Sequence, residues 1–297
     1  MYICKNIVYS KTMSLVTLRE ILRDTRQKKY AVPAFNFNGY EDAQGMINSA
    51  LKMRSPIILM ASMGAVKYIG LKQTAGMIRG MAEMVDIPVC LHLDHGTDMA
   101  LLKEAVVAGF TSVMIDASKE NFEKNIETTR KVVDYAGKFG CSVEAELGKI
   151  GGREEHIVTD SAESALTDPA IVPEFVEKTN VDALAVAVGT AHGFYKSTPK
   201  LDFGRLEDIV GLTGCPLVLH GGTGVPEEDF KKCIRIGMSK INVGTEFKAA
   251  YAGAIRDAVG NYKKDELDPR TYLKHVKEIC EKIADKKIKL FGADGKA

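Results

Sequence analysis

Residues 87–96 read IPVCLHLDHG and contain the pattern that decides the fold. An almost unbroken apolar run ends in two imidazoles and a carboxylate, His92, Asp94 and His95. Strands of parallel sheets are buried on both faces and read as near-continuous apolar runs, so this stretch predicts such a strand. It also raises a question, because three polar side chains gather where a buried strand ends.

Runs of this kind recur along the chain and alternate with segments of helical periodicity. The predicted strands are eight apolar runs: 30–37, 55–62, 87–94, 112–118, 141–148, 183–190, 215–222 and 239–246. The predicted helices are eight segments with apolar residues at three- and four-residue spacing: 41–53, 72–85, 98–109, 120–139, 169–179, 203–211, 227–236 and 246–259. Strand and helix therefore alternate eight times.

This alternation predicts an α/β protein with a (β/α)8 TIM barrel. A doubly wound open sheet is the competing fold, but no GxGxxG motif follows the first strand and polar residues end nearly all strands. We divide the chain into an N-terminal extension, 1–13, and one barrel domain, 14–297. A helix starting at Thr17 is expected to cover the bottom of the barrel, and a further helix is expected from residue 268 onward.

The composition excludes several classes of function. Forty basic and thirty-nine acidic residues give a formal net charge of +1, so no global field favours nucleic acid or an anionic membrane. The chain has no apolar stretch of membrane-spanning length and no signal-peptide pattern at its start, and we expect a cytoplasmic protein. The six cysteines lack CxxC spacing and are expected to be reduced and structural.

Three of the six histidines end predicted strands, namely His95, His192 and His220. In a barrel the carboxyl ends of all strands meet at one mouth, so these residues become neighbours despite their separation in sequence. Three convergent imidazoles suit Zn²⁺, which in catalytic sites keeps a further position open. We therefore predict a zinc site at the mouth, with His92 as a supporting group.

Other polar side chains end the remaining strands, and glycine-rich turns end the last three. The strand-end residues besides the histidines are Asn36, Ser62, Asp94, Asp116, Glu144, Glu146, Asn242 and Thr245. The turns read VGTAHGFYK (188–196), LHGGTG (219–224) and NVGTE (242–246). Small residues let backbone N–H groups approach an anion, and Lys196, Thr223 and Thr245 can donate to it, so we predict a phosphate site there.

The sequence resembles the zinc-dependent class II ketose-bisphosphate aldolases from about Val16 to the C-terminus. The resemblance rests on PAFNFNG, SMGAVKYIG, HLDHGTD, AGFTSVMIDAS, VEAELGKIGG, GTAHGFYK, LVLHGGTG, INVGTE and DPRTYL, which occur in this order. It implies a TIM barrel, a homodimer or homotetramer, and cleavage of a phosphorylated ketose into dihydroxyacetone phosphate and an aldehyde phosphate. A protein with this activity would be an aldehyde lyase.

The resemblance also implies roles for individual residues. Zn²⁺ binds His95, His192 and His220, with Asp116 and Glu146 close to the metal. Asp94 takes the proton of the C4 hydroxyl, and Glu154, on the long connection 149–168, exchanges a proton with the carbon left by cleavage. That connection is predicted to be a mobile active-site loop. Glu144 is expected to support the barrel mouth.

Substrate binding is implied for a further set, which holds mainly the dihydroxyacetone-phosphate end. Its members are Asn36, Ser62, Gly193, Lys196, Gly221, Gly222, Thr223, Asn242, Gly244 and Thr245. A monovalent cation, Na⁺ or K⁺, is expected near the same turns. Arg270 corresponds to an arginine that reaches the second phosphate from a neighbouring subunit, so the complete site would need an oligomer.

Several alternatives remain open at this point. Fructose 1,6-bisphosphate and tagatose 1,6-bisphosphate differ only in configuration at C4, and the sequence does not decide between them. A Schiff-base aldolase would need a lysine at an inward strand end, but Lys149 follows the fifth strand and Lys240 begins the eighth at the opposite end. A metal-dependent hydrolase would carry a paired HxH on the first strand, which is missing. A non-catalytic relative would not need Asp94 and Glu154.

Overall fold

The computed structural model describes residues 14–297 except 155–156, 160–164, 196, 262–264 and 266. The predicted N-terminal extension, 1–13, lies outside the described residues. Eight parallel strands form a closed barrel in the order β1-β11-β10-β8-β5-β4-β3-β2. They are β1 (Val32–Asn36), β2 (Ile57–Ser62), β3 (Val89–Gly96), β4 (Ser112–Ile115), β5 (Ser142–Leu147), β8 (Ala183–Val186), β10 (Leu217–Leu219) and β11 (Met238–Val243). The predicted TIM barrel is confirmed.

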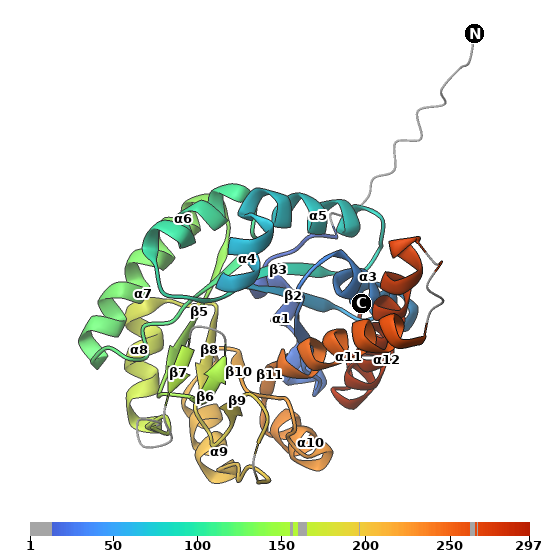
Figure 1. The fold of residues 1–297 in the computed structure, drawn as a ribbon. Helices are drawn as coiled ribbons and strands as arrows, with labels where there is room; N and C mark the ends of the chain where they lie inside the picture. Colours follow the sequence, from blue (N-terminus) through green and yellow to red (C-terminus); the bar gives the residue numbers. More distant parts are fainter. Residues whose placement is uncertain (1–13, 155–156, 160–164, 196, 262–264, 266) are drawn as a thin grey trace.

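Helices surround the barrel, as Figure 1 shows. Their apolar faces cover the outer surface of the strands, whose residues are almost all buried. The helices that follow the strands are α3 (Tyr40–Met53), α4 (Met63–Ile69), α5 (Leu71–Glu83), α6 (Met99–Ala108), α7 (Phe122–Ala136), α8 (Val172–Thr179), α9 (Phe203–Leu212), α10 (Glu227–Ile236) and α11 (Thr245–Asn261). All eight predicted helices are present, and α4 was not predicted.

The bottom of the barrel, formed by the amino ends of the strands, is closed by the N-terminal part of the chain. The predicted helix from Thr17 is divided into α1 (Leu18–Leu22) and α2 (Thr25–Lys28). The backbone N–H of Val16 donates to the carbonyl of Val89 at the start of β3. Arg26 donates to the carbonyls of Thr213 and Cys215 ahead of β10. These contacts place both helices at the bottom, as predicted.

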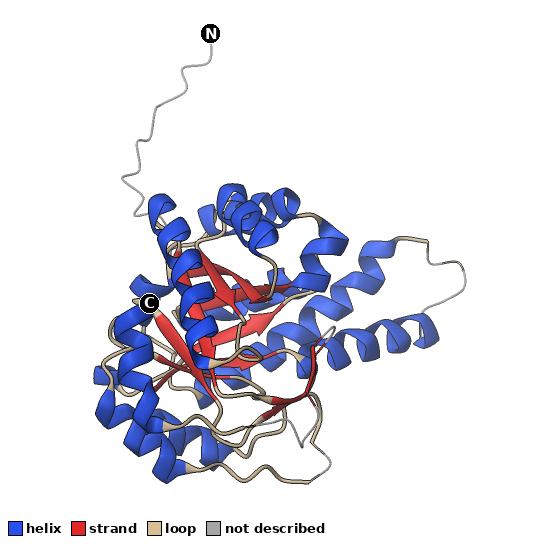
Figure 2. Cartoon of the chain, turned by 90° about the vertical axis from the view of Figure 1, so that its left-hand side faces the viewer, coloured by secondary structure: helices blue, strands red, loops and turns tan. Residues whose placement is uncertain are grey.

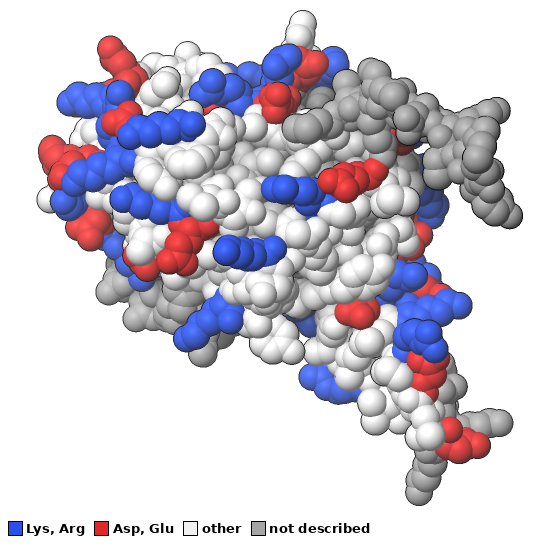
Figure 3. All heavy atoms as spheres, turned by 90° about the horizontal axis from the view of Figure 1, so that it is seen from above, with Lys and Arg blue, Asp and Glu red and all other residues white. Residues whose placement is uncertain are grey.

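The long helix α12 (Pro269–Leu290) confirms the predicted C-terminal helix. It packs beside α3 and α11, and parts of α11 and α12 project from the barrel (Figure 2). On the face in Figure 3, basic and acidic side chains are interspersed. Among the described residues, no helix combines the length and apolar character needed to cross a membrane.

The connection 149–168, predicted to be a mobile active-site loop, contains two short strands. They are β6 (Gly151–Glu154) and β7 (Ile157–Thr159), which pair with each other antiparallel. β6 also pairs in parallel with the short strand β9 (Ala191–His192), so a three-stranded sheet lies apart from the barrel strands. The segment is rich in glycine and charge, so its sequence does not predict strands. The partner strand β9 lies far along the chain, so local sequence does not reveal the pairing.

Candidate active site

A β-bulge brings Asp94 and His95 to the same place. Regular alternation along β3 would point neighbouring side chains to opposite faces of the sheet. Between Leu93 and Gly96, however, the pairing of β3 with β4 shifts register, and His95 has a φ of 48°. A bulge with a left-handed residue re-aims side chains, so the carboxylate and the imidazole both lie buried at the barrel mouth. This irregularity answers the question that residues 87–96 raised.

The three predicted metal ligands converge at the mouth. One nitrogen of each ring of His95, His192 and His220 lies within 4.8 Å of the others. The ring centroid of His95 lies 4.9 Å from that of His192 and 4.7 Å from that of His220, and both pairs of rings meet edge to face. All three side chains are buried. This arrangement can hold one divalent ion between neutral imidazoles.

Carboxylates anchor the outer nitrogens of two of these rings. His95 Nδ1 lies 3.1 Å from Asp116 Oδ2, and His220 Nε2 lies 2.9 Å from Glu144 Oε1. Since ionised carboxylates only accept, both rings present lone pairs on their inner nitrogens, His95 Nε2 and His220 Nδ1, which face each other at 2.9 Å. Two facing lone pairs require a cation or a proton between them, so the donor set fits Zn²⁺.

The pKa values of the rings reflect this environment. Burial lowers the pKa of His192 and of His220, which favours the neutral form that binds a metal. Burial also opposes charge on His95, but the carboxylates of Asp94 and Asp116 outweigh it and raise the pKa of that ring. A proton therefore competes with a metal most strongly at His95.

A second acidic group adjoins the histidines. His95, Asp116 and Glu146 bring ligand atoms within 4.8 Å of one another. Asp116 also accepts hydrogen bonds from the backbone and hydroxyl of Ser118, while burial and the neighbouring Asp116 raise the pKa of Glu146 to about 8. Asp116 thus orients the His95 ring, and Glu146 lies beside it.

The sequence predicts that His192 ends the sixth barrel strand, but the structure places it elsewhere. The barrel strand β8 ends at Val186, and His192 belongs to β9 beside β6. Gly152 of β6 pairs with His192 and has a φ of 99°. A Cβ at Gly152 would lie 2.3 Å from the carbonyl oxygen of His192, so only glycine fits there. The small sheet thereby fixes the backbone of one candidate ligand.

Asp94 is held beside the histidines with one oxygen oriented. Asn36 Nδ2 donates to Asp94 Oδ2 at 2.8 Å, whereas Oδ1 has no hydrogen-bond partner among the described residues. Burial alone would raise the pKa of Asp94, but His95, His220 and Lys240 outweigh it and lower that pKa below its usual range. The carboxylate is therefore ionised and can accept a proton.

The predicted phosphate-binding residues line one cavity next to the histidines. The cavity is lined by Asn36, His192, Gly193, Gly221, Gly222, Thr223, Asn242, Gly244 and Thr245. A Cβ at Gly222 would lie 2.5 Å from the carbonyl oxygen of Asn242, so the turn needs glycine to lie this close to β11. The cavity reaches Thr245, the first residue of α11, where the helix dipole favours an anion.

Two further predicted site residues whose side chains are described, Ser62 and Arg270, do not line this cavity. Ser62 is the N-cap of α4 and accepts from the backbone N–H of Ala65. Arg270 lies in the first turn of α12, where its side chain is 88% exposed and bound to Asp268. Glu154 is the last residue of β6, while Lys196 lies outside the described residues. Their roles stay predictions.

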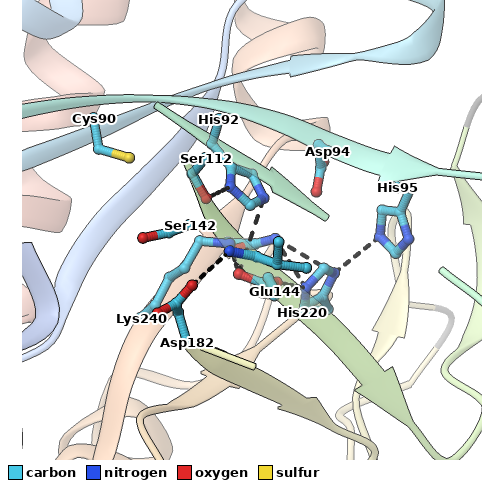
Figure 4. A network of polar contacts seen from close by, with 12 residues as sticks. Cys90, His92, Asp94, His95, Ser112, Ser142, Glu144, Asp182, His220 and Lys240 are labelled. Atoms are coloured by element: carbon cyan, nitrogen blue, oxygen red, sulfur yellow. Dashed lines mark hydrogen bonds and ion pairs between the residues drawn. The ribbon is translucent and has the colours of Figure 1, made fainter. Parts of the chain in front are cut away.

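Sequence reasoning missed the main buried ion pair beneath the histidines. Lys240 Nζ lies 2.7 Å from Glu144 Oε2, and both side chains are fully buried inside the barrel (Figure 4). The sequence predicts Glu144 only as a support of the barrel mouth, and it places Lys240 at the wrong end of its strand for a Schiff base. The two-residue period of a strand could have predicted this pair. Glu144 lies on the same strand face as Glu146, and Lys240 lies on the same face as Asn242.

Comparison with known proteins identifies the family. Residues 16–296 match the family described as "Fructose-bisphosphate aldolase class-II". The chain belongs to the class II fructose-bisphosphate aldolase family. The predicted family and reaction class are confirmed: the chain is a class II aldolase, hence an aldehyde lyase, and zinc dependence is a feature of the class II family.

Named relatives cover nearly the whole chain. A fructose-bisphosphate aldolase of Staphylococcus aureus is 46% identical over 288 residues, 96% of this chain and 100% of the relative. A probable fructose-bisphosphate aldolase of Bacillus subtilis is 44% identical over the same shares. The crystal structure of the YdjI aldolase from Escherichia coli K12 superposes with a TM-score of 0.84 and 35% identity, covering 95% of this chain and 99% of the other. The similarity to class II aldolases thus covers the entire barrel.

Proposed function

We propose that this class II aldolase cleaves fructose 1,6-bisphosphate reversibly into dihydroxyacetone phosphate and glyceraldehyde 3-phosphate, using Zn²⁺ held by His95, His192 and His220. The observation that carries the proposal is the convergence of three buried imidazoles beside the buried carboxylate of Asp94, next to a cavity lined by glycine turns. When bound, the ion acts as a Lewis acid that polarises the substrate's oxygens and stabilises charge as the C3–C4 bond breaks.

Asp94 is the base for the C4 hydroxyl. The proton of that hydroxyl must leave as the C3–C4 bond breaks, and a general base needs an ionised group within hydrogen-bond reach. Asn36 fixes Asp94 Oδ2, so Oδ1 is directed to the substrate. Burial of the carboxylate excludes competing water from the proton transfer.

The glycine turns bind the phosphate of the dihydroxyacetone end. Backbone N–H groups at Gly193 and Gly221 supply donors without a net positive charge, and the N-terminus of α11 adds its helix dipole. Two threonine hydroxyls, an asparagine amide and one lysine complete the set: Thr223, Thr245, Asn242 and Lys196. A monovalent cation, Na⁺ or K⁺, near these turns would balance the phosphate charge.

Glu154 exchanges the proton at the carbon that cleavage leaves behind. Its strand is tied to the site, because β6 pairs with the strand that carries His192. Asp116 and Glu146 support the metal centre through His95. Ser62 belongs to the substrate-binding set at the end of β2, in register with Asp94.

Arg270 binds the second phosphate of a neighbouring subunit's substrate. Its exposed side chain lies at the start of α12 and does not line the cavity of its own chain. The active form would then be a homodimer or homotetramer. A metabolic aldolase of this kind would act in the cytoplasm.

A metal-removal experiment with two substrates tests the proposal. Protein treated with a chelator should lose cleavage activity, and zinc should restore it with a higher kcat/KM on fructose 1,6-bisphosphate than on tagatose 1,6-bisphosphate. The opposite preference would replace the proposed substrate by its C4 epimer. Full activity without metal, together with a covalent adduct after borohydride treatment in the presence of substrate, would overturn the zinc mechanism.

A further inference from the structure

The buried pair of Lys240 and Glu144 lies directly beneath the candidate metal centre. Lys240 comes from β11 and Glu144 from β5, which are not neighbours in the barrel, so the pair spans the interior. Lysine and glutamate are rarely buried completely, and apolar residues of similar volume often stabilise a protein as well as a buried ion pair does. Packing alone therefore does not account for this pair.

Hydrogen-bond polarity gives the pair a direction. The ammonium of Lys240 can only donate, so it holds Glu144 Oε2 as an acceptor at 2.7 Å. The other oxygen, Oε1, lies 2.9 Å from His220 Nε2 and accepts from it. With the proton on Nε2, the lone pair of His220 is on Nδ1, which faces His95 and the centre of the three rings.

The other groups around His220 do not select this tautomer. Asn242 Nδ2 lies 3.3 Å from both ring nitrogens, so it does not distinguish between them. His92 lies deeper, with Nδ1 2.8 Å from Ser112 Oγ and Nε2 3.9 Å from Glu144 Oε2. Among the described residues, Glu144 Oε1 makes the shorter contact with the outer nitrogen of His220, at 2.9 Å against 3.3 Å for Asn242 Nδ2, and it is an acceptor (Figure 4).

We propose that Lys240 and Glu144 form a positioning pair that fixes the protonated nitrogen of His220 and so directs its Nδ1 lone pair toward the metal. The inference rests on the proposed zinc site and assigns neither residue a contact with substrate. In this role Lys240 acts through its ion pair with Glu144 and not as a Schiff-base nucleophile. Removing the outer hydrogen-bond partner of a metal-binding histidine typically lowers the affinity for the metal by 10- to 100-fold.

A matched pair of double variants separates orientation from charge burial. Lys240→Met with Glu144→Gln removes both charges but keeps an oxygen that can accept from His220 Nε2. Lys240→Met with Glu144→Leu removes both charges and the acceptor. The affinity for Zn²⁺, measured by competition with a chromogenic chelator, should fall about 10- to 100-fold in the leucine variant and substantially less in the glutamine variant. Circular dichroism and thermal melts identify the folded fraction.

Nuclear magnetic resonance of the histidine nitrogens measures the tautomer of His220 directly. In wild-type protein with ¹⁵N-labelled histidine, His220 should carry its proton on Nε2, both before and after zinc is added. A proton on Nδ1, or a folded leucine variant that binds zinc as tightly as wild type, would overturn the inference. The outcome for the zinc site itself is read separately: wild-type protein whose zinc affinity is unchanged by His220→Ala would refute the metal site.

Discussion

The two ends of the barrel are built differently from the same strands. At the bottom, α1 covers the strands with apolar side chains such as Leu18 and Leu22. At the mouth, regular structure is interrupted by the bulge at His95 and by glycine turns, and polar side chains are buried. The bottom of the barrel therefore supplies stability, while the irregular mouth positions the reactive side chains.

The largest effect should come from one oxygen at the mouth. Asp94→Asn keeps the size of the side chain but removes the base, so kcat for cleavage should fall by roughly 10²- to 10⁴-fold while zinc remains bound. Steady-state kinetics and metal analysis of the purified variant measure both quantities. Asp98→Asn makes the same chemical change at the cap of α6 and should leave kcat unchanged. Wild-type turnover in Asp94→Asn would remove this residue from the mechanism.

A substitution at the bottom should affect stability alone. Leu18 is fully buried in α1, so Leu18→Ala should lower the free energy of unfolding by about 2–5 kcal/mol through the cavity it leaves. Denaturant titration measures the loss, and kcat per folded molecule should stay at the wild-type value. Leu212→Ala, at a half-exposed position in α9, should cost no more than about 0.5 kcal/mol. A lower kcat in folded Leu18→Ala would break the division between the two ends.

Sequence patterns predicted the regular parts of the molecule better than the irregular ones. Apolar runs identify the eight barrel strands because each is buried on both faces, and glycine turns mark the mouth. The bulge at His95 has no such signal, since it depends on how β3 pairs with β4. The partner of Lys240 is equally hidden, because Glu144 lies 96 residues away and a lysine alone predicts a solvent-exposed position.

The small sheet over the mouth offers an intermediate test. Gly152→Ala would place a Cβ 2.3 Å from the carbonyl of His192 at a φ of 99°, so the substitution should cost about 1–3 kcal/mol and displace β9. Because misplacing a catalytic group by about 1 Å can cost 10²-fold, kcat should fall by roughly one to two orders of magnitude. Kinetics and zinc titration measure this effect.

A glycine on the outer surface provides the control for Gly152. Gly76 lies exposed in α5, and a Cβ there would meet no atom within 4 Å. Gly76→Ala should therefore leave kcat unchanged and leave the protein as stable as wild type or up to about 1 kcal/mol more stable. Equal kinetics for the two variants would show that β6 does not hold His192 in place.

The smallest effect concerns the cysteines near the bottom. Cys90, Cys141 and Cys215 lie at or just before the starts of β3, β5 and β10, and all three are buried. Burial raises the pKa of Cys90 and of Cys215 to about 12, which leaves almost no reactive thiolate at pH 8. Iodoacetamide should modify these two thiols on the order of 100-fold more slowly in native protein than in urea, as peptide mass spectrometry can measure. Since the chemistry lies at the other end of the strands, activity should survive the treatment; rapid labelling of Cys90 in active protein would mean that the bottom of the barrel opens.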